Sequence, residues 1–572
     1  MMNCPRPEHP NPQFERKDWV NLNGIWDFEF DFSDSGLERD FASRTELDQK
    51  IVVPFCPESR LSGIGFRDFI PAVWYHRTFS VEKEKLDGCI WLHFGAVDYE
   101  CRVFVNGREA GRYQGGYASF ALQISDLVHE GENHLTVFAR DDTRSLLQPS
   151  GKQSDRHASY GCFYTRTTGI WQTVWLEFTP SACLRQVRYY PDIAQKKLVI
   201  QAEVQGSGTL SAVAAYQGNE CGRAEAFSHG GSVFLSLELS ELHLWEPGAG
   251  RLYDLTLTYG EDQVSSYFGM RDLRLDGFRF LINGKSVFQR LVLDQGFYPD
   301  GIYTAPQDEA LRRDIELAME AGFNGARLHQ KVFEPRFLYH CDRMGYLVWG
   351  EMASWGLDIS SSASYAAFLP EWAQVVQRDF NHPAIIGWCP FNETWDVQGR
   401  RQLDELIAHT WQLTRTLDPT RPCIDTSGNY HVQTDIFDLH DYQQDPEVFA
   451  ASYRDFANGT GPFADPYADR QHYRESMPVM ISEYGGIRWS VHDDNRQAWG
   501  YGEAPKTEAE FIARYTALTD TLLSNPRFFG FCYTQLTDVE QEQNGLYTDQ
   551  REAKMDPAIF RAVNSQKAAI ED

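Results

Sequence analysis

Eight short apolar runs recur between residues 288 and 534, and helical patterns separate several of them. Each run is too short for a helix and suits a strand that is buried on both faces of a sheet. Strands that alternate with helices predict a parallel sheet, and eight such strands close a (β/α)8 barrel. The eight runs are 288–293, 324–328, 346–349, 384–389, 423–425, 436–439, 478–482 and 528–534.

Local signals mark the ends of two of the helices expected between these runs. Thr304, with Gln307 three residues later, forms a capping-box pattern, which predicts that a helix begins there. Pro335 and Gly345 bracket a second helical pattern, because proline is tolerated in the first turn and glycine commonly ends a helix. The chain from residue 276 onward is therefore predicted to alternate between strands and helices.

The preceding residues have a different pattern, and a chain of 572 residues is too long for a single hydrophobic core. Residues 1–180 contain short alternating runs and turn signals such as Asn106-Gly107, which predict a jelly-roll β-sandwich. Residues 181–275 contain roughly seven further strand patterns, which are typical of an immunoglobulin-like β-sandwich. Residues 276–572 then form the third predicted domain, a C-terminal (β/α)8 TIM barrel.

Composition disfavours several classes of partner. The formal charge is −28, from 53 basic and 81 acidic residues, whereas nucleic acids and anionic membranes bind basic patches. The N-terminal segment lacks a basic region followed by an apolar run, and no stretch of about 18 apolar residues occurs. Neither a secretory signal nor a membrane partner is therefore expected. Eleven scattered cysteines without a CxxC pair predict reduced thiols and a cytoplasmic location.

The fourth and seventh apolar runs each lead into a glutamate. Glu393 lies in WCPFNETW at 388–395, and Glu483 lies in VMISEYGG at 479–486. The C-terminal ends of barrel strands form the active face, so both carboxyl groups are expected at the same rim. Two such groups can serve as the proton donor and the nucleophile of a retaining glycosidase. A single acidic residue at a strand end is more often structural, but two in these contexts favour catalysis.

Two neighbours of the glutamates are candidates to assist them. Asn392 could hydrogen-bond a sugar 2-OH, a contact that strengthens in the transition state of glycosidases. Tyr484 is a candidate to orient a carboxylate. No metal-binding motif such as HExxH occurs, and neither a metal nor another cofactor is expected.

Both glutamate motifs resemble those of a known enzyme family. WCPFNETW and VMISEYGG are similar to the acid/base and nucleophile motifs of glycoside hydrolase family 2, the family of bacterial β-galactosidases and β-glucuronidases. The resemblance implies a sugar-binding jelly roll, an immunoglobulin-like linker domain and a catalytic barrel, with Glu393 as the acid/base and Glu483 as the nucleophile. Further similar stretches are NLNGIWDFEFD (21–31), FGAVDYECRVFVNG (94–107), TTGIWQTVWLE (167–177), FGMRDLRLDGFRFLINGKSVFQR (268–290), FNGARLHQ (323–330) and FEPRFLYHCDRMGYLVWGE (333–351).

The resemblance also implies residues that bind the sugar. Arg327 and His329, which end the second run, match the family's Arg–His pair. The alternative is an arginine paired inside the barrel and a histidine bonded to backbone. His440 and Tyr442, after the sixth run, occupy the place of sugar-contacting or nucleophile-orienting groups. The remaining candidates are Asp294 and Gln295, which end the first run, and Tyr533 in the eighth run, where the family usually has a tryptophan.

The choice of sugar depends on another stretch. The β-glucuronidases of the family hold the uronate carboxylate with an Asn-x-Lys motif after the eighth strand. The comparable stretch here, Asn544-Gly545-Leu546, has no lysine, although Lys331 or Arg488 could bind a carboxylate from another direction. A neutral sugar is therefore expected. The predicted activity is that of an exo-acting retaining β-galactosidase-like enzyme or an α-L-arabinopyranosidase, which removes terminal sugars from oligosaccharides or other glycosides.

Two alternatives stay open. One is a β-uronidase that acts on glucuronides or galacturonides. The other is a non-catalytic carbohydrate-binding protein, which the presence of both carboxyl groups disfavours. By analogy with the family, a homo-oligomer, either a dimer or a tetramer, is expected.

Overall fold

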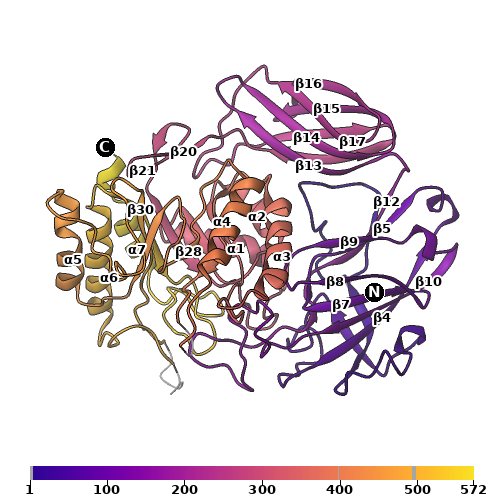
Figure 1. Ribbon diagram of the computed structural model, residues 1–572, viewed down its shortest axis with the longest axis horizontal. Helices are drawn as coiled ribbons and strands as arrows, with labels where there is room; N and C mark the ends of the chain where they lie inside the picture. The colour runs from indigo at the N-terminus through magenta and orange to yellow at the C-terminus, as the bar shows by residue number, and fades with distance from the viewer. Residues whose placement is uncertain (1–3, 397–398, 492–497, 572) are drawn as a thin grey trace.

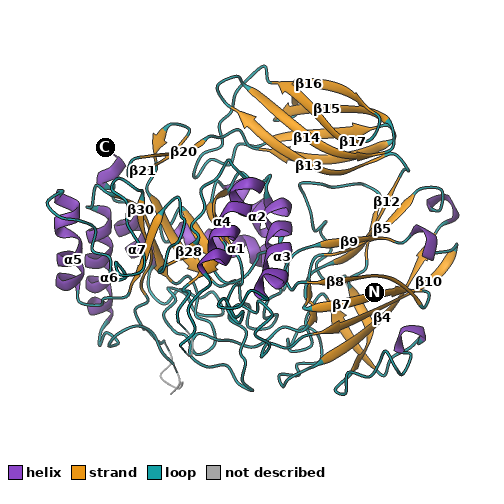
Figure 2. Ribbon diagram, in the orientation of Figure 1, coloured by secondary structure: helices purple, strands orange, loops and turns teal. Residues whose placement is uncertain are grey.

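The computed structural model describes residues 4–396, 399–491 and 498–571. Two β-sandwiches and a barrel of strands and helices follow one another along the chain (Figure 1). The sandwiches consist mainly of strands and loops, whereas the long helices all surround the barrel (Figure 2). This arrangement confirms the predicted fold class.

The first sandwich contains the strands β1 (Trp19–Asn21), β2 (Gly24–Phe30), β3 (Gln49–Val53), β4 (Ala72–Val81), β5 (Cys89–Phe94), β6 (Val97–Asp98), β7 (Glu100–Val105), β8 (Arg108–Gln114), β9 (Phe120–Gln123), β10 (Gly131–Arg140), β11 (Gly169–Ile170) and β12 (Val174–Thr179). Two sheets, of order β1-β12-β5-β9 and β3-β2-β4-β10-β7-β8, account for most of them. Buried side chains that include Trp26, Tyr75 and Leu92 form its core.

The second sandwich contains seven strands: β13 (Cys183–Asp192), β14 (Lys197–Gln205), β15 (Gly208–Tyr216), β16 (Asn219–Ser228), β17 (Gly231–Glu238), β18 (Tyr253–Tyr259) and β19 (Asp262–Phe268). They form a three-stranded sheet, β13-β14-β17, and a four-stranded sheet, β16-β15-β18-β19. Along β17, Val233, Leu235 and Leu237 are buried and the residues between them are exposed. This alternation is expected for a sheet with one face in the core and one in water.

The barrel follows a small sheet of β20 (Leu273–Asp276), β21 (Arg279–Ile282) and β22 (Lys285–Ser286). Its strands are β23 (Gln289–Asp294), β24 (Gly325–Leu328), β25 (Leu347–Glu351), β26 (Ile385–Cys389), β29 (Phe437–Asp441), β30 (Val479–Gly485) and β31 (Phe528–Thr534). These seven pair in one parallel sheet of order β26-β25-β24-β23-β31-β30-β29.

The fifth predicted barrel strand is less regular than the other seven. Cys423 forms an isolated parallel bridge with Trp388, and β28 (Thr426–Ser427) pairs with β27 (Phe391–Asn392) at the rim. On its other side, the hydroxyl of Ser427 donates to the carboxylate of Asp438 in β29 at 2.6 Å. This side-chain contact and an isolated backbone bond, from the N–H of Asp435 to the carbonyl of Cys423 at 3.1 Å, therefore close the barrel where a regular ladder is missing.

The described helices are α1 (Asp308–Glu320), α2 (Pro335–Met344), α3 (Ser364–Asp379), α4 (Asp404–Leu417), α5 (Pro446–Asn458), α6 (Glu508–Leu523) and α7 (Pro557–Asn564), and none of them is long and apolar enough to cross a membrane. The predicted ends of α2 are confirmed, with Gly345 in the left-handed conformation at φ 67°. The capping-box prediction is wrong, because α1 begins after Gln307 and the Thr304 hydroxyl donates instead to the carbonyl of Trp171 at 2.6 Å.

The loop between β10 and β11 carries part of the first sandwich onto the rim of the barrel. The backbone N–H groups of Ser150 and Gly151 both donate to the carbonyl of Trp355, at 2.8 and 3.0 Å. Gly151 has a φ of 57°, and a Cβ at this position would lie 2.4 Å from the carbonyl oxygen of Gln330. Glycine therefore permits the close approach. Gln330 and Trp355 follow β24 and β25, so the loop lies at the C-terminal face of the barrel.

Candidate active site

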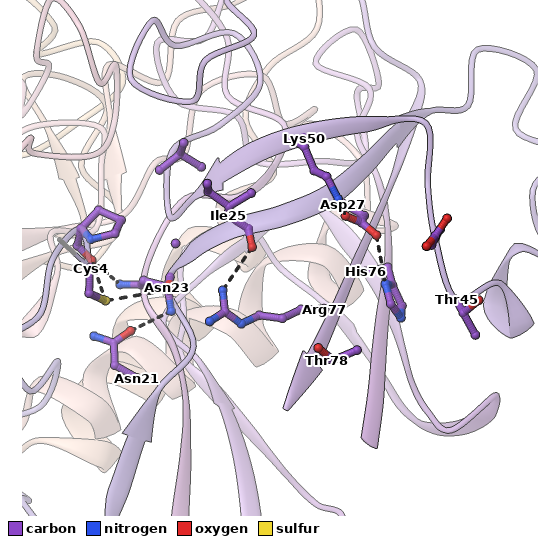
Figure 3. Close-up of a pocket in the computed structure, with 14 residues that line it drawn as sticks. Cys4, Asn21, Asn23, Ile25, Asp27, Thr45, Lys50, His76, Arg77 and Thr78 are labelled. Atoms are coloured by element: carbon purple, nitrogen blue, oxygen red, sulfur yellow. Dashed lines mark hydrogen bonds and ion pairs between the residues drawn. The ribbon is translucent and has the colours of Figure 1, made fainter. Parts of the chain in front are cut away.

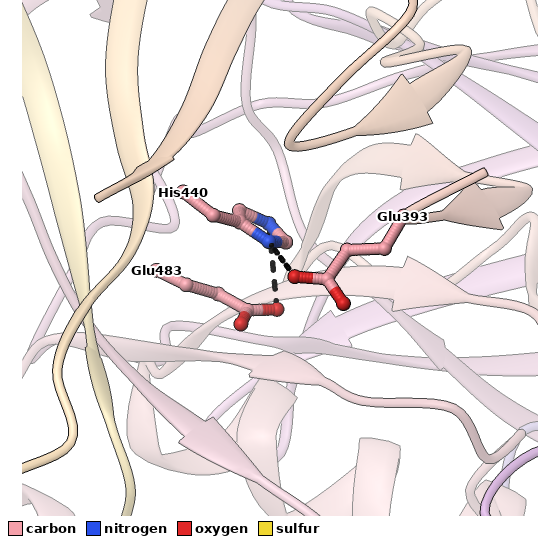
Figure 4. Close-up of side chains that lie close together, drawn as sticks. All are labelled: Glu393, His440 and Glu483. Atoms are coloured by element: carbon pink, nitrogen blue, oxygen red, sulfur yellow. Dashed lines mark hydrogen bonds and ion pairs between the residues drawn. The ribbon is translucent and has the colours of Figure 1, made fainter. Parts of the chain in front are cut away.

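Glu393 and Glu483 face one another at the C-terminal end of the barrel (Figure 4). Glu393 directly follows β27, and Glu483 lies in β30, the seventh strand position. One carboxylate oxygen of each glutamate and one ring nitrogen of His440 all lie within 4.8 Å of one another. The carboxyl groups of retaining glycosidases lie about 5–5.5 Å apart, so this spacing suits that class of enzyme.

The two glutamates differ in exposure. The side chain of Glu393 is 16% exposed and that of Glu483 is 5% exposed, so Glu393 lies nearer the solvent. Glu393 has a φ of 43°, in the left-handed region that residues with a side chain rarely adopt. Its N–H donates to the carbonyl of Ser427 at 2.9 Å, which helps to hold this conformation. Backbone strain of this kind is concentrated at functional sites.

Glu483 is held in its ionised form. The phenol of Tyr442 donates to Oε2, and Nη1 of Arg327 donates to Oε1 at 3.1 Å. Burial raises the pKa of Glu483, but the charges of His440 and Arg327 lower it to about 2. A carboxylate that stays ionised at neutral pH can act as a nucleophile.

Arg327 connects several groups of the site. Its guanidinium is buried and donates to Glu483, to Oε2 of Glu351 at 2.9 Å and to Oδ1 of Asn392 at 2.7 Å. Burial raises the pKa of Glu351, but Arg327 and His329 lower it to about 2. The arginine is therefore both paired inside the barrel and in contact with a candidate catalytic group.

Asn392 and the two histidines complete the contacts of the glutamates. The Nδ2 group of Asn392 is buried and has no hydrogen-bond partner among the residues that the structure describes, so its donors are available to a sugar hydroxyl. Nδ1 of His329 lies 3.0 Å from Oε1 of Glu351, and burial lowers the pKa of this histidine. His440 lies between the two candidate catalytic residues, 2.7 Å from Glu393 and 3.4 Å from Glu483.

Two of the predicted site residues do not reach the glutamates. The hydroxyl of Tyr484 lies 2.9 Å from that of Thr519 on α6, and the ring of Tyr533 packs against Tyr515 of the same helix at 4.9 Å. Successive side chains of a strand point to opposite faces, so the residue after Glu483 turns towards the helices. The role predicted for Tyr484 is wrong for this reason, and Tyr533 in β31 likewise packs on the helix side of the barrel wall.

Asp294 and Gln295 are buried at the end of β23 but make other contacts. The carboxylate of Asp294 accepts a hydrogen bond from the N–H of Gly296 at 2.9 Å, and burial raises its pKa to about 7. The amide of Gln295 donates to Gln535 at 2.7 Å. Within the described part of the chain, neither Asp294 nor Gln295 hydrogen-bonds to Glu393 or Glu483. The structure therefore gives neither residue a role in orienting the glutamates.

Three residues at the site were missed by the sequence analysis. Tyr501 stacks on Tyr442 with ring centres 3.4 Å apart. Trp395 is 41% exposed, and its indole N–H donates to Oε2 of Glu393 at 3.4 Å. Lys152 reaches the barrel mouth from the first sandwich. Trp395 belongs to the motif WCPFNETW and could have been found there, whereas no local pattern marks Tyr501 or Lys152.

A separate cavity of about 760 Å³ lies in the first sandwich (Figure 3). Asp27, Lys50, His76 and Arg77 are among its lining residues, and Asp27 forms an ion pair with Lys50. All of its lining residues precede residue 79, so it contains no part of the site around the glutamates.

Two family models match the chain. The model described as "Glycosyl hydrolases family 2, sugar binding domain" matches residues 20–180, and the one described as "Glycosyl hydrolases family 2, TIM barrel domain" matches residues 274–568. A β-glucuronidase of Paenibacillus borealis is 25% identical and is aligned over 95% of this chain and 96% of its own length. A β-galactosidase of Thermoanaerobacterium thermosulfurigenes is 24% identical over 72% of this chain and 57% of its own length.

Solved structures share the architecture. A β-glucuronidase of Lactobacillus rhamnosus superposes with a TM-score of 0.80 over 99% of this chain and 100% of its own, at 18% identity. A β-glucuronidase from an uncultured Clostridium species superposes with a TM-score of 0.78 over 97% and 99% of the two chains, at 21% identity. These likenesses show a shared fold, and the barrel model, which matches more than half of the chain, shows the family. The chain belongs to glycosyl hydrolase family 2 and is a glycoside hydrolase.

Proposed function

We propose that the protein is an exo-acting retaining β-glycosidase that releases a terminal hexuronic acid from β-uronides. Glu483 is the nucleophile and Glu393 is the general acid and base. The observation that carries the proposal is the approach of one oxygen from each glutamate to within 4.8 Å at the active face of the barrel.

The reaction follows two displacements. In the first, the carboxylate of Glu483 attacks the anomeric carbon, the bond to the aglycone oxygen breaks, and the carboxyl group of Glu393 donates its proton to that oxygen. In the second, the ionised Glu393 takes a proton from water, whose oxygen attacks the anomeric carbon and displaces Glu483. Two inversions at the anomeric carbon give net retention.

The surrounding residues have distinct roles in this proposal. Tyr442 and Arg327 orient the carboxylate of Glu483 and keep it ionised. The buried Nδ2 group of Asn392 donates to the sugar 2-OH, where hydrogen bonds strengthen in the transition state. His440 contacts both glutamates, and its charge lowers the pKa of Glu483.

The relatives support a uronide rather than the neutral sugar that the sequence analysis favours. The P. borealis protein, which aligns with nearly the whole chain, is named a β-glucuronidase, as is a protein of Sus scrofa that is 26% identical over 82% of this chain. The β-galactosidase of T. thermosulfurigenes aligns over a smaller share. A β-galactosidase is the second candidate, and the missing lysine in the segment at Asn544 favours it.

A panel of 4-nitrophenyl glycosides tests the proposal. It comprises the β-glucuronide, β-galacturonide, β-galactoside, β-glucoside, β-xyloside and α-L-arabinopyranoside. We expect the uronides to have the highest kcat/KM, and we expect ¹H NMR to detect the β-anomer as the first product. A higher kcat/KM for the β-galactoside would favour the second candidate. The α-anomer as the first product would exclude a retaining mechanism.

A further inference from the structure

Lys152 lies in the loop that docks the first sandwich onto the barrel. Its backbone carbonyl accepts a hydrogen bond from the N–H of Tyr164 at 2.7 Å. The residue is 5% exposed. Its ammonium lies 5.6 Å from the ring centre of Trp355 in the barrel and 5.7 Å from that of Tyr164 in the sandwich. A lysine of one domain therefore ends among aromatic rings at the mouth of another.

The ammonium of Lys152 has hydrogen-bond donors that no described residue accepts. Among the described residues, no oxygen accepts a hydrogen bond from Nζ and no carboxylate forms an ion pair with it. Glu542 is the acidic residue that contacts the same tyrosine, but each of its oxygens already has a donor. Oε2 accepts from the phenol of Tyr164, and Oε1 accepts from the amide of Asn544 at 3.1 Å. A buried cation without an anion is costly, so such a site favours an anionic ligand.

Trp355 links this lysine to the candidate catalytic residues. Its indole N–H donates at 2.9 Å to the carbonyl of Asn392, the residue before Glu393, and its ring centre lies 6.4 Å from that of His329. After burial, the charge of Lys152 is the largest cause of the lowered pKa of His329. The ammonium is therefore close enough to the glutamate site to act on its electrostatics.

We infer that Lys152 binds the carboxylate of the hexuronate and so determines the preference for uronides over neutral sugars. The inference rests on the proposed function and extends it to a specific residue. A carboxylate loses hydration when it enters a buried site, and a charge-assisted hydrogen bond to an ammonium offsets that loss. The hydroxymethyl group of a neutral hexose carries no charge and has no such need.

The other lysine considered for this role is already occupied. Nζ of Lys331 donates to the carbonyls of Gly296 and Tyr303, and the side chain is buried between them. Arg488 follows β30 and is partly exposed, so its variant provides a direct comparison with variants of Lys152.

The experiment compares substrates that differ only at C6. 4-Nitrophenyl β-D-glucuronide and β-D-glucoside form one pair, and the corresponding galacturonide and galactoside form another. We expect Lys152→Met to lower kcat/KM for the uronides by about 10- to 100-fold, the effect of losing one charge-assisted hydrogen bond. For the neutral partners we expect kcat/KM to fall by less than about 3-fold. Lys152→Arg, which keeps the charge, should retain most of the uronide preference, and Arg488→Gln should leave that preference intact.

Each other outcome has a definite meaning. No uronide activity in the wild-type enzyme would overturn the proposed function and this inference with it. A wild-type uronidase whose Lys152→Met variant loses activity equally on both members of a pair would overturn the inference alone, because it would indicate a structural lysine. Selective loss in Arg488→Gln would likewise assign the carboxylate contact elsewhere.

Two additions keep the test decisive. If Lys152→Met does not fold, Lys152→Gln serves as the second variant, with thermal unfolding measured beside activity. 4-Carboxyphenyl β-D-glucoside carries its charge on the leaving group instead of the sugar. The inference would be overturned if the Lys152 variants lost activity on this substrate and kept their activity on the uronides.

Discussion

Nδ1 of His440 lies 2.7 Å from Oε1 of Glu393, and the other ring nitrogen lies 3.4 Å from Oε1 of Glu483. Burial lowers the pKa of His440, but the two glutamates raise it, and the net shift is upward. A protonated His440 favours the ionised form of Glu483. The ionisation of the proposed nucleophile therefore depends on His440, which lies between it and the proposed acid/base.

Replacing His440 by glutamine should move the acid limb of the bell-shaped pH profile of kcat/KM to higher pH. The charge of His440 lowers the pKa of Glu483, so loss of the imidazolium raises the pKa of the nucleophile, which sets this limb. The measurement is kcat/KM against pH, with His409→Gln on the exposed face of α4 as the control. An unchanged profile, or a shift to lower pH, would contradict this role.

Loss of either glutamate should nearly abolish turnover without unfolding the protein. Glu393→Gln should lower kcat by about 10²- to 10⁴-fold, the usual contribution of general acid–base catalysis. Glu483→Gln should lower it further, because no covalent intermediate can form. Azide should restore turnover of Glu483→Gly and give a glycosyl azide of inverted configuration, which ¹H NMR identifies. Normal turnover by either glutamine variant would rule out the assigned roles.

Tyr442→Phe should lower kcat by about 10- to 100-fold, because it removes a hydrogen bond to a charged carboxylate. The stacking of Tyr501 on the ring is retained in this variant. Tyr484→Phe is the matched control, since that hydroxyl faces Thr519 on α6 and should change kcat by less than about 3-fold. Similar losses in both variants would contradict the opposite orientations of the two tyrosines.

Arg327→Met should destabilise the barrel by about 3–5 kcal/mol, because it leaves the buried carboxylates of Glu351 and Glu483 without their cation. Arg313→Met is the control: it removes an exposed pair with Glu320, which is worth about 0–1 kcal/mol. Urea unfolding followed by tryptophan fluorescence measures the difference between the variants. Equal midpoints would show that the buried network adds nothing to stability.

His431 should make the stability of the barrel depend on pH. Its ring nitrogens lie 2.7 Å from Asp425 and 3.2 Å from Asp438. Burial lowers the pKa of His431, but these carboxylates raise it from 6.5 to about 10. Because the folded state holds this proton more tightly, the stabilisation is complete below pH 6.5 and is lost as the pH rises through 10.

The comparison with His431→Gln isolates this contribution. The urea midpoint of the wild-type protein should exceed that of the variant at pH 6, and the excess should shrink between pH 6.5 and 10. Taking the difference removes the titration of other groups common to both proteins. An excess that stays constant over this range would contradict a proton held by His431.

Much of the fold could be predicted from local patterns. Apolar runs of strand length between helical patterns identify the barrel, and Pro335 and Gly345 mark the ends of α2 because their backbone preferences act within a few residues. The same runs identify Glu393 and Glu483 as residues at strand ends. The fifth strand is less regular than its apolar pattern predicts, because it pairs with β27 only at the rim and otherwise makes isolated backbone bonds and side-chain contacts.

The sequence by itself determined the order of the strands and the two carboxyl groups that meet at their C-terminal ends, since periodicity and strand direction are local properties. Only the tertiary structure decided that Tyr442 and not Tyr484 supports Glu483, because Tyr442 directly follows β29 and reaches the carboxylate, whereas Tyr484 in the adjacent β30 faces α6. It also brought Lys152 to the barrel mouth, across some two hundred residues from Trp355. Such contacts depend on how whole domains pack, and no short pattern in the chain encodes that packing.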